Sequence, residues 1–114
     1  MGYPFARTAR VRKRGAFVEI QRLGRKLSGP KLLLFMRAQR TPGPARLGVT
    51  VSRRVGGAVV RNRVKRLLRE VYRLNPDWFG AGRDHVFVAK PGAAELDFAG
   101  VRDEVERLCK RGMT

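Results

Sequence analysis

The spacing of apolar residues changes near the middle of the chain. Residues 46–52 alternate apolar residues with small or polar ones, the period-2 pattern of a strand that is covered on one face. From Ala58 onward the apolar residues recur every three or four positions, which is the period of a helix. Gly56-Gly57 supply the backbone freedom for the turn between them. The pattern predicts a strand that leads directly into a helix over residues 58–74.

This predicted helix has an apolar side and a basic side. At about 100° per residue, one stripe collects Val60, Val64, Leu67, Val71 and Leu74, flanked by Leu68. The opposite side collects Asn62, Lys65, Arg66, Arg69 and Arg73. A solvated basic face is the plainer interpretation, but Glu70 is the only acidic residue between positions 49 and 74, so local pairs cannot neutralise the charge. Arginine also binds phosphate oxygens bidentately, and the helix therefore favours a polyphosphate partner.

The segments before this unit predict a helix and a strand. Residues 15–23 have the apolar spacing of a short helix that ends at Gly24, and Gly24-Arg25-Lys26 starts a predicted loop. Residues 31–38 are predicted as a strand with an unbroken apolar centre. The Pro- and Gly-rich residues 41–44 predict a turn that joins this strand to the next as a hairpin-like connection.

The segments after the basic helix predict one more strand and one more helix. Asn75-Pro76 ends the basic helix, because proline cannot continue its hydrogen bonds. Residues 84–90 alternate as a strand, and Asp97 is the predicted N-cap of a last helix. The order helix, strand, strand, helix, strand, helix indicates an α+β protein, an α/β sandwich. We expect a basic N-terminal arm over residues 1–10 and a single domain over 11–114.

Charge narrows the class of partner. The 114 residues include 26 Lys and Arg against 9 Asp and Glu, a net charge of +17. Such a charge favours nucleic acid, and an anionic membrane surface is the competing interpretation. The basic residues are spread along the chain instead of flanking one long apolar segment, so we expect no membrane partner. Cys109 is the only cysteine, which excludes an intrachain disulfide and is consistent with a cytoplasmic protein.

No catalytic constellation is evident in the sequence. His85 is the only histidine and lies inside a strand pattern, where a structural role is more common than general-base catalysis. Cys109 lies on an apolar helix side and indicates core packing. The aspartates are dispersed, whereas Mg²⁺ needs several converging oxygens. We therefore expect no catalytic residues, no metal site and no cofactor bound by the protein alone.

One run of residues resembles a known family. Val51-Ser52-Arg53-Arg54-Val55-Gly56, followed by 58–66 with its Arg61-Asn62-Arg63 core and then Arg69-Glu70, is similar to the signature of the bacterial ribonuclease P protein subunit. A match of about fifteen ordered positions is far more specific than a lone glycine motif. The resemblance is strong over residues 49–73 and diffuse over the rest of 17–111.

The resemblance implies a function without a protein-borne catalytic centre. In ribonuclease P the RNA subunit carries the Mg²⁺-dependent cleavage, and the protein helps to hold the 5′ leader of precursor tRNA. The resemblance also implies a left-handed βαβ crossover, although general physics favours the right-handed one. The partners expected are the ribonuclease P RNA and precursor tRNA, with no further protein required. The residues implied to contact the RNA subunit are Arg53, Arg54, Arg61, Asn62, Arg63, Lys65, Arg66 and Arg69.

The leader cleft of the family lies between the first helix and the central strands. At matching positions this chain has Phe17 and Phe35, which can stack on single-stranded bases, although core packing explains each aromatic equally well. Gln21 stands where an aromatic is common, and Arg25 and Lys26 match the family's basic loop. The alternatives are a structural RNA-binding protein of ribosomal type, a helix-turn-helix DNA-binding module, and, least favoured, a nuclease that acts alone.

Overall fold

A four-stranded sheet of order β1-β2-β4-β3 forms the centre of the protein. The computed structural model describes residues 10–11, 14–40 and 43–113. Its strands are β1 (Arg25–Ser28), β2 (Leu32–Ala38), β3 (Arg46–Thr50) and β4 (Arg83–Ala89). β1 with β2 and β2 with β4 are antiparallel, whereas β3 and β4 are parallel. The parallel pair needs a crossover connection, and the helix between the two strands supplies it.

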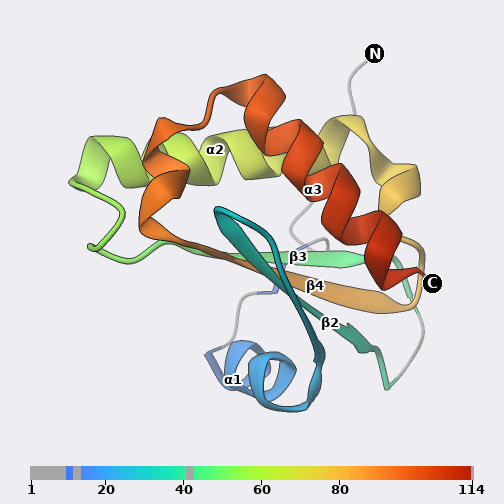
Figure 1. Cartoon of the computed structure of the whole chain (residues 1–114). Helices are drawn as coiled ribbons and strands as arrows, with labels where there is room; N and C mark the ends of the chain where they lie inside the picture. Colours follow the sequence, from blue (N-terminus) through green and yellow to red (C-terminus); the bar gives the residue numbers. More distant parts are fainter. Residues whose placement is uncertain (1–9, 12–13, 41–42, 114) are drawn as a thin grey trace.

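Three helices cover the sheet from two sides. They are α1 (Arg14–Leu23), α2 (Ala58–Leu74) and α3 (Phe98–Gly112), and short 3₁₀ turns η2 (Pro76–Trp78) and η3 (Pro91–Glu95) follow α2 and β4. Figure 1 shows α1 alone on one face and α2 with α3 on the other. The α+β sandwich is thereby confirmed, while the left-handed sense of the β3-α2-β4 crossover stays a prediction.

Strand alternation divides the apolar residues between two cores. In β2, Leu32, Leu34 and Met36 are buried against α2 and α3, and the residues between them face α1. The larger core lies on the α2 and α3 side. The smaller core has Val11, Ile20 and Val86 as its buried members. We call the side of the sheet that carries this smaller core the α1-side face.

Two predicted connections are wrong. The loop predicted from Gly24 is strand β1 from Arg25 onward, an edge strand that adds one element to the predicted order. β2 and β3 do not form a hairpin, because β4 inserts between them. Neither error is visible locally, since β1 has four residues and its pairing depends on β2.

The helix ends follow the predicted local chemistry. Asp97 Oδ1 accepts a hydrogen bond from Gly100 N at 2.8 Å, which confirms the N-cap of α3. α2 ends at Leu74, before Asn75-Pro76. At Gly24 a Cβ atom would overlap the carbonyl oxygens of Ile20 and Met36, so only glycine fits between α1 and β2.

The first described residues, Arg10 and Val11, pair with β3. Val11 N donates to Leu47 O at 2.8 Å, and Arg10 forms an isolated parallel bridge with Leu47. Residues 1–9 of the predicted arm, and residues 41–42 of the predicted turn, lie outside the described residues.

Candidate RNA interface

The exposed side of α2 and the loop before it bring together four of the predicted RNA-binding residues. Val64, Leu68 and Val71 are buried, which turns Asn62 and Arg66 toward solvent. Arg53 and Arg54 are exposed on the loop that leads from β3 into α2. Because the apolar stripe fixes the rotation of the helix, these polar side chains can reach an external partner.

A second group of basic residues lies on one flank of α2. Tyr72 Oη donates to Ala45 O at 2.6 Å, so this flank faces the start of β3. Arg61 and Lys65 are half-buried on the same flank, and within the described part of the protein the Nε of Arg61 is buried without a hydrogen-bond partner. Burial and the positive charge of Arg10 lower the pKa of the half-buried Arg69 guanidinium. Positive charges held close together in this way favour the binding of an anion from outside the protein.

Arg63 differs from its neighbours in the motif. Its guanidinium donates to Ala94 O near the end of η3 and, at 2.8 Å, to Leu96 O just after it. These hydrogen bonds satisfy carbonyl groups that lie outside the regular hydrogen bonding of an α-helix or a sheet. The structure therefore places Arg63 on the α3 flank of α2, away from Arg61 and Lys65, and gives it a function inside the protein.

The predicted leader residues Phe17 and Phe35 lie together on the α1-side face. Both rings are half-buried and pack against the smaller core. A Cβ atom at Gly48 would come within 2.7 Å of Phe17 Cε1, so the missing side chain lets the ring lie directly on β3. Gln21 is half-buried on α1. Each aromatic thus has one side for packing and some surface left for stacking on a base.

The two basic residues predicted beside the leader are separated by the strand. Lys26 pairs in register with Phe35, so both project from the α1-side face. Arg25 pairs with Met36 on the opposite face and donates to Gly112 O at the end of α3, at 3.1 Å. The structure therefore brings Lys26, but not Arg25, to the predicted leader residues.

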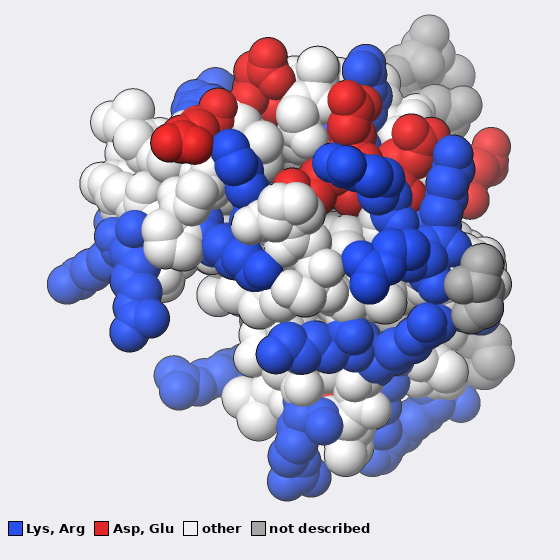
Figure 2. Space-filling view, in the orientation of Figure 1, with Lys and Arg blue, Asp and Glu red and all other residues white. Residues whose placement is uncertain are grey.

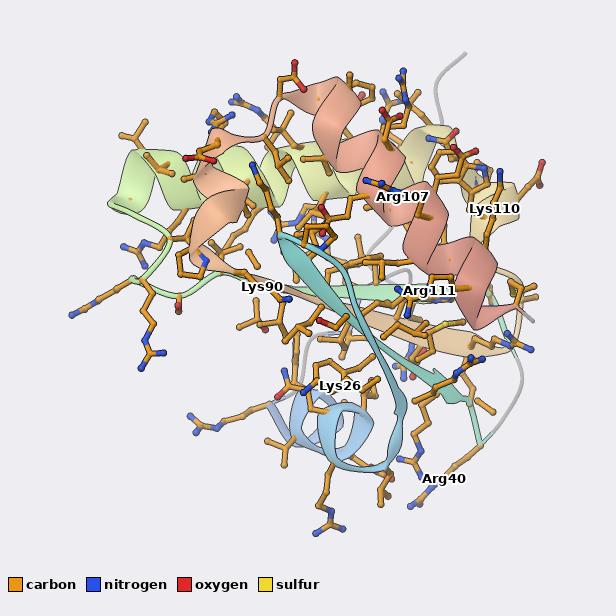
Figure 3. All side chains as sticks on the ribbon, in the orientation of Figure 1. Lys26, Arg40, Lys90, Arg107, Lys110 and Arg111 are labelled. Atoms are coloured by element: carbon orange, nitrogen blue, oxygen red, sulfur yellow. The ribbon has the colours of Figure 1, made fainter. Side chains whose placement is uncertain are left out.

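Lys90 is a functional candidate that sequence analysis missed. It follows β4, and its ammonium donates to Ser28 Oγ at 2.9 Å and Gly29 O at 2.6 Å. Ser28 pairs with Leu33 on the α1-side face, so Lys90 and Lys26 lie at the same edge of the sheet (Figure 3). The sequence did hold a signal for this position. In the period-2 pattern of a strand, Lys90 falls on the same face as Val86 and Val88.

The nucleophilic and general-base candidates lie in the core. His85 is fully buried, and burial followed by the charge of Arg83 lowers its pKa to about 4. Burial raises the pKa of the Cys109 thiol to about 12, so the thiolate is not accessible at neutral pH. Across residues 10–11, 14–40 and 43–113, no three His, Cys, Asp or Glu side chains are placed to share a metal ion.

Surface charge agrees with a polyanionic partner. Figure 2 shows acidic side chains mainly over the α2 and α3 side, whereas Lys and Arg dominate around β1 and α1 below. Among the described helices, none is long and apolar enough to cross a membrane. The fold and this surface define the class: a small α+β domain with an arginine-rich helix for nucleic acid.

Comparison with known proteins identifies the family. The family model described as Ribonuclease P matches residues 5–112. The ribonuclease P protein component of Desulforapulum autotrophicum is 41% identical over 109 residues, covering 96% of this chain and 92% of that protein. Its counterpart from Desulfovibrio desulfuricans is 45% identical over 112 residues, covering 96% and 86%. The chain therefore belongs to the ribonuclease P protein family.

A solved structure agrees with the fold. The RNase P protein from Thermotoga maritima superposes with a TM-score of 0.80 at 32% identity, covering 90% of this chain and 96% of that one. The family and the fold confirm the resemblance found in the motif and the α+β architecture, and they make this chain a protein component of ribonuclease P.

Proposed function

We propose that this chain binds the ribonuclease P RNA through α2 and the loop before it, and the 5′ leader of precursor tRNA on the α1-side face. The observation that carries the proposal is the placement of the two residue groups on different sides of one sheet. Arg53, Arg54, Asn62 and Arg66 are exposed beyond the larger core, while Phe17, Phe35 and Lys26 gather on the other face.

The chemistry of each surface suits its proposed partner. Guanidinium groups on α2 contact phosphates and recognise the shape of a folded RNA more than its sequence. Half-exposed aromatic rings stack on bases of any identity, and Lys26 and Lys90 attract the backbone beside them. A leader of variable sequence requires such tolerance.

In this proposal the Mg²⁺ ions that support cleavage are held by the RNA, and the protein contributes binding and orientation. It binds no cofactor of its own, works in the cytoplasm and needs no second protein. Its own side chains carry out no chemical step of the cleavage.

Reconstitution tests the proposal. A bacterial ribonuclease P RNA is incubated with 5′-labelled precursor tRNA at low Mg²⁺, with and without the protein. We expect the protein to restore accurate leader removal and to be inert alone. If it binds the RNA yet never restores cleavage at any salt or Mg²⁺ concentration, the structural RNA-binding function replaces this one.

A further inference from the structure

Three adjoining hollows follow the end of the sheet that is farthest from the loop of Arg53 and Arg54. The first, of about 400 Å³, lies between α1 and the ends of β2, β3 and β4. It shares Glu19 and Arg40 with a second hollow of about 600 Å³ against α1. It shares Arg37 and Ala38 with a third, of about 340 Å³, beside the end of α3. Together they form one continuous surface, which we call the arginine end.

Among the described residues, every basic residue that lines these hollows is an arginine. The set comprises Arg14, Arg22, Arg25, Arg37, Arg40, Arg46 and Arg83, against the two carboxylates Glu19 and Asp84. The arginine end is therefore strongly positive, and its cations are those with the planar fork that matches phosphate. Figure 3 shows Arg40 at this end, far from Arg107 on α3.

The two carboxylates are already occupied by neighbouring arginines. Glu19 forms ion pairs with Arg37 and with Arg40, and these guanidiniums hold its pKa below the usual value. Asp84 accepts from Arg46 Nε at 2.8 Å and Nη2 at 2.6 Å, and from Gln39 Nε2 at 2.9 Å. These bonds fix the positions of three arginines at the mouth of the first hollow.

Arg14, Arg22 and Arg83 form no ion pair with a carboxylate of the described residues. Arg14 and Arg22 are exposed on α1, two turns apart and so about 12 Å along its axis. An Nη of Arg83 donates to the sulfur of Met113, at 3.2 Å. Their charge is left for a partner outside the protein.

The shape and position of the surface indicate what that partner is. Small-molecule sites are enclosed, whereas these hollows are open and are lined by charged side chains. The surface extends from the outer side of α1 to the end of α3, past the edge of the face proposed for the leader. A partner that touches all of it is larger than a short single strand, and a stable electrostatic contact suits a resident subunit better than a product that must leave after each turnover.

We infer that the arginine end makes a second contact with the backbone of the ribonuclease P RNA. The segment of RNA bound there is helical and is separate from the segment of RNA that binds α2. This inference rests on the proposed function, because it takes the RNA subunit as the partner. The protein then holds its RNA at both ends of the sheet, with the leader face between the two contacts.

A matched pair of triple variants tests the inference. The first is Arg14→Ala, Arg22→Ala and Arg83→Ala. The control, Arg102→Ala, Arg107→Ala and Lys110→Ala, removes the same charge from exposed positions on α3. Binding to the RNA subunit is measured across salt concentrations, with thermal unfolding to verify that both variants fold. A third variant with lysine at positions 14, 22 and 83 keeps the charge.

We expect the first triple variant to weaken binding by roughly tenfold or more and to reduce the salt slope by about 2 to 3, as loss of three phosphate contacts requires. The control should change the slope by less than about 1, and the lysine variant should retain most of the wild-type slope. Equal changes in the first triple variant and the control would overturn the inference.

Two further outcomes would also overturn it. In one, the first triple variant weakens only the binding of precursor tRNA to the assembled holoenzyme, which assigns the surface to the substrate. In the other, it loses only binding to phosphatidylserine vesicles, which assigns the surface to a membrane. If the wild type binds the RNA and restores cleavage, these results reject the second contact alone. A wild type that does not bind the RNA at all rejects the proposed function as well.

Discussion

At the residue scale, His85 shows how burial decides the chemistry of a side chain. Its ring meets Phe79 edge-on with centroids 5.0 Å apart, and in the described structure neither ring nitrogen has a hydrogen-bond partner. Desolvation therefore outweighs the favourable charge of Asp84 and keeps the imidazole neutral. The only histidine is therefore a buried, neutral core residue.

This burial predicts an acid-sensitive stability. In the unfolded chain His85 takes up a proton near pH 6.5, whereas the folded protein resists protonation down to about pH 4. The contribution of neutral His85 to the free energy of unfolding is thus fully present above pH 6.5. It is lost as the pH falls toward 4, by up to about 3 kcal/mol. Urea unfolding of the wild type and His85→Leu at pH 7, 5.5 and 4.5 should show a smaller pH dependence in the variant. Parallel profiles would contradict this account.

At the element scale, different sides of the helix α2 have three different roles. Val64, Leu68 and Val71 are buried in the larger core. Arg63 binds backbone carbonyls near the end of η3, and Arg66 faces solvent. A signature of adjacent basic residues thus combines groups that bind outside with a group that stabilises the fold. The rotation of α2 about its axis, relative to the sheet, decides which of these residues face solvent and which face the protein.

Two single substitutions on α2 should separate these roles. Arg66→Ala should lower the salt slope for RNA-subunit binding by about 1 and leave thermal unfolding unchanged. Arg63→Ala leaves the carbonyls of Ala94 and Leu96 without their donor, so it should cost about 1–3 kcal/mol of stability and change the slope less. An unchanged slope in Arg66→Ala would remove that residue from the interface, and an unchanged unfolding temperature in Arg63→Ala would refute its structural role.

At the scale of the whole molecule, the charge of +17 acts on a domain with a radius of gyration of 13.0 Å. Acidic groups near the sheet are already paired, as at Asp84 and Glu19, so much of the positive charge has no internal compensation. Self-repulsion of this kind lowers the stability of the free protein, and a polyanion that binds the folded state raises it.

Thermal stability should therefore rise with ionic strength. Between 0.1 and 1 M NaCl the screening length falls from about 10 to about 3 Å. We expect the unfolding temperature of the free protein to rise by several degrees, since about 1 kcal/mol corresponds to about 4–8 °C in a domain near this size. Calorimetry across this range measures the effect. A temperature that is independent of salt would show that repulsion does not limit stability.

Much of the fold and of the candidate site follows from local sequence. The strand over 46–50, the helix over 58–74 and the N-cap at Asp97 were predictable because period, capping and proline act within a few residues. The signature around Arg61 was recognisable for the same reason, since its residues are contiguous. These features need no knowledge of what lies across the sheet.

Only the tertiary structure decided how these elements meet. β1 exists because β2 pairs with it, and β4 separates β2 from β3, which are relations between segments distant in sequence. The same pairing puts Arg25 and Lys26 on opposite faces. Packing of α2 against α3 turns Arg63 inward. The end of the sheet gathers arginines from α1, from all four strands and from the segment after β2 into one surface. Burial and charge at a point in space depend on every segment that reaches it, and the order of residues along the chain does not specify which segments those are.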